Sequence, residues 1–257
     1  MEAAGGRVES NAPDTPRPAR TDGVARVAPM TPGGRIRICV FAKPPLPGRV
    51  KTRLARTVGS GPAADLALAF LRDTWSTVRA LDWADCVIAT TDVRAMAAAA
   101  PGGSEIWPQG TGDLGDRMTR VLRRALRSHE AAIVIGTDVP DLPANRLAST
   151  RRLLRTHEAV LGPADDGGFY LLGLTRCPPQ LLAGLAWSQP RTGRDTLARL
   201  QGLGLDVATI ASWHDVDDEA GLRCLRQRPA TLARRAPATA AAIAQLDVTS
   251  RRTGDQA

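Results

Sequence analysis

The sequence predicts an α/β fold, a three-layer α/β/α sandwich in which helices cover both faces of a mostly parallel central sheet. Short apolar runs alternate with segments of helical periodicity through the middle of the chain. Strands separated by helices of this length are usually parallel, and strands buried on both faces are apolar throughout. Acidic and glycine-rich motifs follow several apolar runs. Ligands of such sheets bind beyond the carboxyl ends of the strands, so we expect these motifs to form one site.

The short apolar runs, bounded by turn-forming residues, are predicted to be strands. They are Ile36–Ala42, Cys86–Thr90, Ala132–Gly136, Ala159–Gly162, Phe169–Leu174 and Asp206–Ile210. Longer segments with apolar residues three and four positions apart are predicted to be helices. They are Ala63–Leu81, Leu114–Leu126, Leu147–His157, Thr196–Leu203 and Glu219–Leu225.

The chain of 257 residues divides by composition into three parts. Residues 1–35, rich in Pro, Gly, Ala and charge, are expected to be a disordered leader, and residues 36–228 are expected to be a single folded domain. Residues 229–257 form an Ala/Arg-rich tail, expected to be partly helical and then disordered. The leader lacks a signal-peptide core, no apolar stretch is long enough to span a membrane, and the four cysteines form no C-x-x-C pair. These features predict a cytoplasmic protein.

The net charge of +8 comes from arginines spread along the chain, and aromatic residues are only 4% of it. A surface that binds nucleic acid usually has aromatic side chains, on which bases stack, placed among its cations. Because this chain has few aromatic residues, we expect no specific nucleic-acid partner. The chain has only two lysines, Lys43 and Lys51, and both lie in the loop after the first predicted strand. Arg49 and Arg53 add two cations, and Gly48 permits a tight turn. This loop predicts a phosphate site, although it is neither a Walker A nor a Rossmann motif; the alternative is a solvated basic loop.

Two acidic motifs follow later strands. Asp138 lies two positions after the end of Ala132–Gly136 and suits a divalent cation, Mg²⁺ or Mn²⁺, that bridges protein and diphosphate. An Asx-turn or helix cap is the alternative, and for Asp141 we favour the helix cap. Asp215 and Asp217 alternate, so in extended backbone both point the same way, and one of them is a candidate second ligand. In the same motif, Asp218 is expected to cap a helix, and His214 is expected to be a structural or surface histidine and not a ligand.

Two glycine-rich motifs complete the expected site. In Gly162–Tyr170, Asp165 or Asp166 is a candidate to bind an acceptor hydroxyl or act as a base; the alternative is a hairpin turn. In Gln109–Met118, backbone N–H groups around Gly112 and the side chain of Arg117 are candidates to contact a ligand. Asp113 is equally suited to cap the following helix. The segment from Trp187 to Thr192 is expected to be a mobile or substrate-covering loop.

Four of these motifs, in this order, resemble a known family. They are Phe41–Leu54, Gln109–Met118, Gly136–Leu142 and Gly162–Leu174. Over about residues 36 to 226 the chain resembles the GT-A-like radical-SAM/selenodomain-associated transferase 1 proteins, described as DUF2064 glycosyltransferases. The resemblance implies the nucleotide-diphospho-sugar transferase fold and a metal-dependent site for a nucleotide.

The wider superfamily implies roles for single residues. By its pattern Lys51 and Arg53 contact phosphates, Asp138 is the first metal ligand and Asp217 the second. The Asp-x-Asp of glycosyltransferases is absent after the central strand, where Gly136-Thr137-Asp138 contains one aspartate. The run from Lys51 to Leu54 also resembles phospholactate guanylyltransferases.

Three functions therefore remain open. The first is glycosyl transfer from a nucleoside-diphosphate sugar to a small acceptor, and the second is nucleotidyl transfer with release of pyrophosphate from a nucleoside triphosphate. The third is a protein without catalytic activity, either a nucleotide-binding regulatory module or one that adheres to nucleic acid.

Overall fold

The computed structural model describes residues 34–254, which contain a seven-stranded sheet of order β3-β2-β1-β4-β6-β5-β7. The strands are β1 (Ile36–Ala42), β2 (Ala84–Thr90), β3 (Ile106–Pro108), β4 (Ala131–Gly136), β5 (Ala159–Pro163), β6 (Phe169–Leu174) and β7 (Val207–Thr209). Strands β1 to β4 pair in parallel, as do β5 and β7, whereas β6 is antiparallel to both of its neighbours. The predicted α/β class with a mostly parallel sheet is confirmed.

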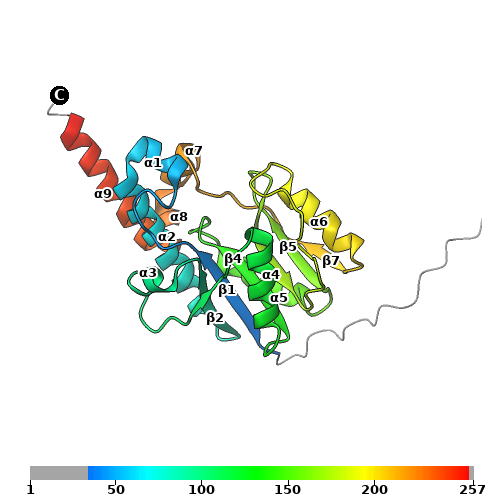
Figure 1. Cartoon of the computed structure of the whole chain (residues 1–257). Coiled ribbons are helices and arrows are strands. Elements are labelled where there is room, and N and C mark those ends of the chain that lie inside the picture. Colours follow the sequence, from blue (N-terminus) through cyan, green and yellow to red (C-terminus); the bar gives the residue numbers. More distant parts are fainter. Residues whose placement is uncertain (1–33, 255–257) are drawn as a thin grey trace, which may run out of the picture.

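Helices connect these strands and pack against both faces of the sheet (Figure 1). They are α1 (Thr52–Val58), α2 (Ser60–Arg79), α3 (Val93–Ala97), α4 (Leu114–Ala125), α5 (Ala144–Leu153), α6 (Thr192–Gly202), α7 (Glu219–Arg226), α8 (Pro229–Arg235) and α9 (Pro237–Gly254). Side chains of α2, α3 and α5 share one core with β1, and side chains of α4 and α6 share the core on the opposite face. The predicted three layers are therefore present.

Strand β1 shows why the sheet needs both layers. Ile38 and Val40 are fully buried in the core with α2 and α5, while Cys39, between them, is fully buried in the core with α4. Successive side chains of a strand point to opposite faces, so an unbroken apolar run requires apolar cover on each side. The run Ile36–Ala42 was predicted with the same bounds that the structure has.

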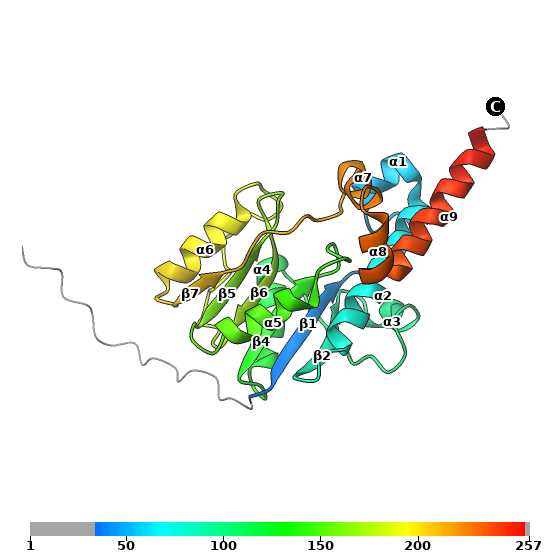
Figure 2. The ribbon, with the colours of Figure 1, turned by 180° about the vertical axis from the view of Figure 1, so that it is seen from behind.

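A third apolar cluster lies beside the sheet and joins α1, α2, α7, α8 and α9, which gather at one end of the molecule in both Figure 1 and Figure 2. Leu54 of α1, Val216 before α7 and Leu222 of α7 are fully buried in it. Asp73, in the middle of α2, accepts hydrogen bonds from the backbone N–H groups of Ala238 (3.0 Å) and Thr239 (2.7 Å). The cluster therefore fixes the starts of α1 and α7, which lie next to Lys51 and Asp217 in the sequence.

Several elements differ from the expectations. Strand β3 and the short helices α1 and α3 were not predicted, and α5 and α6 begin three or four residues earlier than predicted. Residues 1–33 of the expected leader lie outside the described part of the chain. The tail forms α8 and α9, and α9 extends to Gly254. Among residues 34–254, no helix is both long and apolar enough to cross a lipid bilayer.

Candidate functional site

A cleft of about 770 Å³ lies where β1 and β4 end, beyond their carboxyl ends. Its walls come from the loop after β1, the loop after β4, the start of α4, the β5–β6 turn and the segment before α6. The lining side chains that bear charge are Lys43, Lys51, Arg53, Asp113, Arg117, Asp138, Asp166 and Asp217. The ends of neighbouring parallel strands thus bring together motifs that are far apart in the sequence, as expected for this type of sheet.

Lys51 occupies the centre of the charged wall. Its Nζ atom lies 2.5 Å from Asp138 Oδ1 and 2.8 Å from Asp217 Oδ1, and it donates a third hydrogen bond of 2.8 Å to the carbonyl of Val216. An ammonium has three N–H donors, so all of them have acceptors. Burial by itself lowers the pKa of Lys51, but the charges of Asp138 and Asp217 outweigh it and raise that pKa above its usual value.

The backbone of Lys51 is as unusual as its side chain. Its φ of 47° and ψ of 43° are left-handed, and it is the N-terminal cap residue of α1. The carbonyl of Lys51 accepts the N–H of Ala55 at 2.8 Å, and the buried Leu54 anchors the same turn. Phe70 lies below, with its ring centroid 5.2 Å from Nζ. Non-glycine residues in this conformation cost free energy and are concentrated at functional sites.

Asp138 and Asp217 have a shared orientation because their loops are bonded to each other. The N–H of Val216 donates to the carbonyl of Asp138 at 2.9 Å, and Asp218 then caps α7 through the N–H of Gly221 at 3.0 Å. The cap predicted for Asp218 is confirmed. Both cleft carboxylates direct one oxygen at the same cation, and their side chains remain 46% and 43% exposed.

This donor set fits a divalent cation that takes further ligands from a substrate. Within residues 34–254, no three or more His, Cys, Asp or Glu side chains are arranged to hold a metal by themselves. Mg²⁺, however, is commonly bound by one or two carboxylates together with phosphate oxygens and water. Asp138 and Asp217 converge on a cation already, and their exposed sides leave room for those ligands.

Asp141 is not a helix cap, contrary to our prediction. The residue that caps α5 is Pro143, which has no side-chain acceptor. Asp141 is instead buried, accepts a 3.1 Å hydrogen bond from Trp213 Nε1 and lies 3.1 Å from His214 Nε2. Burial raises the pKa of Asp141, but its contacts with His214 and Trp213 outweigh this and leave the pKa below its usual value. The pairing attaches the 213–217 segment to the loop after β4, and His214 is structural as expected.

Asp215 differs from the other carboxylates near the cleft. Burial, and then repulsion from Asp166, Asp217 and Asp138, raises its pKa to about 6. Asp166 is exposed, lines the cleft and accepts the N–H of Gly168 at 2.8 Å within the β5–β6 turn. A carboxylate whose pKa lies near neutrality is suited to accept a proton.

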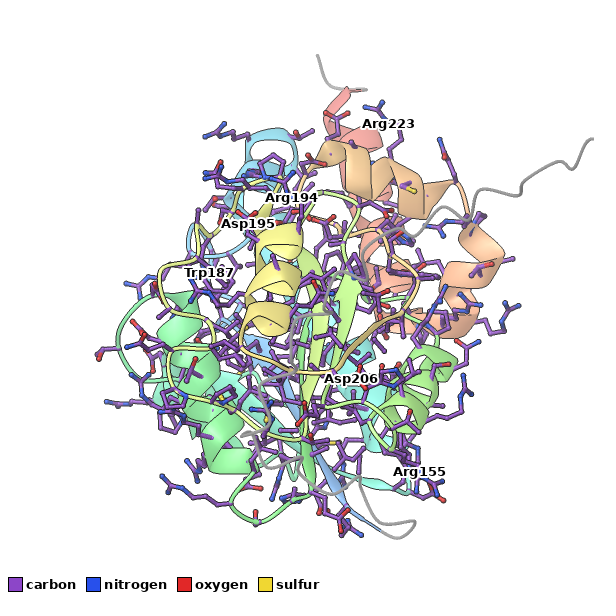
Figure 3. The ribbon with its side chains drawn as sticks, turned by 90° about the vertical axis from the view of Figure 1, so that its right-hand side faces the viewer. Arg155, Trp187, Arg194, Asp195, Asp206 and Arg223 are labelled. Carbon is purple, nitrogen blue, oxygen red and sulfur yellow. The ribbon has the colours of Figure 1, made fainter. Side chains whose placement is uncertain are left out.

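The β5–β6 turn supports the segment before α6. The N–H of Gly193 donates to the carbonyl of Gly167 at 2.8 Å, and a Cβ on Gly167, whose φ is 88°, would lie 1.9 Å from the carbonyl oxygen of Pro190. Figure 3 shows Trp187 on this segment, on the side of α6 where α4 lies. Trp187 lines the cleft and packs edge-on against Phe169, with ring centroids 6.3 Å apart.

Trp187 also differs from the other four tryptophans. Each of those has an arginine guanidinium between 3.8 and 6.0 Å from its ring centroid. Among the described contacts Trp187 has no such neighbour, and its buried Nε1 has no hydrogen-bond acceptor. Ser188, the next residue, is left-handed with φ 57° and also lines the cleft.

The opposite wall is formed by Gln109 and the start of α4. Gln109 is buried, donates to the carbonyl of Ala89 at 2.8 Å and accepts from Arg117 at 3.3 Å. Asp113 and Asp116 form a capping box at the start of α4, so the cap that we considered for Asp113 is present. Arg117 is held at the cleft by these contacts and by the carbonyl of Asp113.

Most of the expected site residues line this one cleft. The structure brings together Lys43, Lys51, Arg53, Arg117, Asp138, Asp166 and Asp217. The lining does not include Gly48, Arg49, Gly112 or Asp165. Gly48 and Arg49 belong to an exposed turn before α1, Gly112 turns with φ 98° beside the Asp116 side chain, and Asp165 is exposed. Phe70, whose ring lies beneath Lys51, belongs to the predicted helix Ala63–Leu81, and the apolar periodicity of that helix does not reveal this contact.

Comparison with known proteins supports the resemblance. Residues 74–189 match the family model described as an uncharacterized protein conserved in bacteria, DUF2064, which confirms the family resemblance. A search of curated proteins gives no match. The matched region contains Asp138 and Asp166 but neither Lys51 nor Asp217.

Among solved structures, the chain is similar to a proposed nucleotide-diphospho-sugar transferase from Desulfovibrio desulfuricans G20. The two are 29% identical with a TM-score of 0.76, over 84% of this chain and 97% of that one. A CMP:2-keto-3-deoxy-manno-octonic acid synthetase complexed with CTP is 14% identical, with a TM-score of 0.52 over 76% and 98% of the two chains. A 4-diphosphocytidyl-2C-methyl-D-erythritol synthase from Anaerococcus prevotii DSM 20548 is 12% identical, with a TM-score of 0.50 over 75% and 96%. The predicted nucleotide-diphospho-sugar transferase fold is confirmed.

Proposed function

We propose that the chain is a transferase that uses a nucleotide-activated donor, in keeping with its similarity to the proposed nucleotide-diphospho-sugar transferase from Desulfovibrio desulfuricans G20. The observation that supports this most directly is the position of Lys51 Nζ, 2.5 Å from Asp138 and 2.8 Å from Asp217 at the strand ends. Two carboxylates and several cations at one strand edge are what a diphosphate with a divalent cation requires.

The cationic residues of the cleft are assigned to the diphosphate. Lys43, Lys51 and Arg53 line the same wall, and their N–H groups are suited to donate to phosphate oxygens. Asp138 and Asp217 would hold Mg²⁺ or Mn²⁺. When bound, such an ion neutralises charge that develops on a departing diphosphate.

The preferred reaction is glycosyl transfer to a small acceptor. The bond between the sugar carbon and the diphosphate oxygen breaks, and a bond forms from that carbon to an acceptor oxygen or sulfur. Asp166 is assigned to orient the acceptor and receive its proton, because it lines the cleft and Asp165 does not. The likeness to the Desulfovibrio protein, described as a proposed nucleotide-diphospho-sugar transferase, supports this choice.

Nucleotidyl transfer is the second candidate. At the end of β4, Gly136-Thr137-Asp138 contains one aspartate where the glycosyltransferase Asp-x-Asp motif would contain two. In this reaction a substrate phosphate attacks the α-phosphate of a nucleoside triphosphate and pyrophosphate leaves. The same cations, Lys43, Lys51 and Arg53, would then stabilise the charge on the phosphoryl groups.

One experiment tests the proposal and separates the two reactions. The purified chain is incubated with Mg²⁺ and with panels of nucleotide sugars and nucleoside triphosphates, each with candidate acceptors, and followed by ³¹P NMR and thermal unfolding. Release of nucleoside diphosphate from a nucleotide sugar supports glycosyl transfer, and release of pyrophosphate supports nucleotidyl transfer. If no nucleotide reacts or raises the unfolding temperature, both are wrong.

A further inference from the structure

The contacts of Lys51 have a consequence for the order in which ligands bind. We propose that the Lys51 ammonium and a divalent cation exclude each other between Asp138 and Asp217, and that a bound diphosphate ends this competition by becoming the new partner of Lys51. This inference rests on the proposed function, because it takes the diphosphate and the cation as the ligands of the cleft.

The competition follows from the geometry of the free protein. Asp138 Oδ1 and Asp217 Oδ1 both point at Nζ, at 2.5 and 2.8 Å, so the ammonium occupies the position from which both oxygens can be reached. With the carbonyl of Val216 as third acceptor, Lys51 has no donor left for a phosphate. Lys51 therefore contacts a phosphate only after it breaks one of these bonds.

The charges explain why the two ligands favour each other. Asp138, Asp217 and the Lys51 ammonium together have a net charge of about −1, which repels a diphosphate at this point of the cleft. A divalent cation that replaces the ammonium removes this negative charge, and the released ammonium adds a positive charge on the diphosphate side. The two carboxylates alone are too few ligands for Mg²⁺, whose remaining positions suit phosphate oxygens and water. Binding of each ligand thus increases the affinity for the other, as thermodynamic linkage requires.

The local structure permits this exchange without rearrangement of the fold. The backbone of Lys51 is held by its bond to Ala55 and by the buried Leu54, so only the side chain has to move. Lysine has a flexible four-carbon stem that can swing between nearby partners. Asp138 and Asp217 are each nearly half exposed, and water and a metal ion can reach them when the ammonium leaves.

Binding of Mn²⁺ without any nucleotide tests the exclusion. Electron paramagnetic resonance measures the affinity for Mn²⁺ of the parent, of Lys51→Met and of Lys43→Met. Lys43→Met is the matched control, because it removes the only other lysine, which is exposed and lines the same cleft. We expect Lys51→Met to bind Mn²⁺ roughly ten- to a hundredfold more tightly than the parent. In the parent the ion must first break charge-assisted hydrogen bonds of Lys51, and the free energy of one such bond corresponds to a change of this size. The Mn²⁺ affinity of Lys43→Met should stay within about threefold of the parent's, because Lys43 is exposed and solvent screens its charge from the ion. If Lys51→Met binds no more tightly than Lys43→Met, the proposal is wrong.

A second measurement uses the unaltered chain and does not depend on how a variant folds. With two lysines only, selective ¹⁵Nζ labelling gives two side-chain signals, and the spectrum of Lys43→Met assigns them. We expect the Lys51 signal to keep its position with Mg²⁺ alone or inorganic pyrophosphate alone and to shift when both are added. A signal that stays in place with both contradicts the proposal. The Mn²⁺ comparison needs no nucleotide, so its failure is distinguishable from failure of the transferase assay.

Discussion

Lys51 Nζ and Asp217 Oδ1 are 2.8 Å apart, although 166 positions separate the two residues in the sequence. The apolar cluster of α1, α2, α7, α8 and α9 explains their proximity, since Leu54 and Val216, each close in sequence to one of the pair, are buried in it. The C-terminal helices thus help to position both charged residues.

Replacement of Asp217 by Asn is expected to abolish stabilisation by Mg²⁺ with nucleotide. The amide keeps the shape of the side chain but removes one of the two carboxylates. The fold should lose only about 1 kcal/mol, because the Asp217 side chain is 43% exposed and Lys51 keeps Asp138 and the Val216 carbonyl as acceptors. The measurement is the unfolding temperature with and without Mg²⁺ and a nucleoside diphosphate.

The matched control for Asp217→Asn is Asp218→Asn. Asp218 is the adjacent carboxylate and caps α7, a position where Asn is as suitable as Asp. The control should retain the full ligand-induced shift. Equal shifts in the two variants would show that Asp217 has no part in the site.

Asp215 is expected to reduce stability at neutral pH. Its pKa is raised to about 6 by burial and by Asp166, so ionisation of Asp215 costs more free energy in the folded than in the unfolded chain. This destabilisation is fully present above pH 6 and is lost as the pH falls toward 3.8, the usual value. Asp215→Asn should therefore raise the free energy of unfolding in urea at pH 7.5, by a margin that shrinks markedly at pH 4.5. A margin that does not change with pH would contradict the assignment.

Asp73 is expected to hold α9 on α2. It is buried and accepts the N–H groups of Ala238 and Thr239 and the Thr239 hydroxyl, at 3.0, 2.7 and 2.6 Å. Asp73→Ala leaves these groups at the start of α9 unpaired, which should cost about 2–3 kcal/mol in urea unfolding. Asp65→Ala, an exposed aspartate on the same helix, should change stability by less than about 0.5 kcal/mol. Similar losses in both variants would contradict a specific role of Asp73.

Trp187 is expected to report ligand binding by fluorescence. Its indole lines the cleft, whereas Trp83 lies before β2 with Arg151 5.2 Å from its ring centroid. The emission change that Mg²⁺ and a nucleoside diphosphate produce in the parent should be largely lost in Trp187→Phe and retained in Trp83→Phe. Persistence of the change in Trp187→Phe would mean that the ligand lies elsewhere.

The regular parts of the fold could be predicted because local patterns specify them. The apolar run Ile36–Ala42 has the bounds of β1, and the alternation of strands and helices led to the correct fold class. Strand β3 has only three residues and ends in proline, and α3 has five residues, so neither has a periodicity long enough to detect. Helix α1 begins inside the cationic motif, where charge obscured the helical pattern.

The site could be predicted as a set of residues but not as a set of contacts. Strand ends meet at one edge of a parallel sheet, which is why Lys51, Asp138 and Asp217 were expected near one another. That the ammonium of Lys51 would bond to both carboxylates depends on side-chain positions across 87 and 166 residues of sequence. The pair of Asp141 and His214 depends on a similar long-range approach, and for this reason the local cap pattern misled us about Asp141.

The most direct test of the proposed site is a crystal structure of the chain with Mn²⁺ and a nucleoside diphosphate, in which anomalous scattering locates the ion. We predict an ion bound by Asp138, Asp217 and phosphate oxygens, with the Lys51 ammonium moved from the carboxylates to the diphosphate. A diphosphate bound outside the cleft, or an ion elsewhere while Lys51 keeps both of its carboxylate partners, would contradict the account.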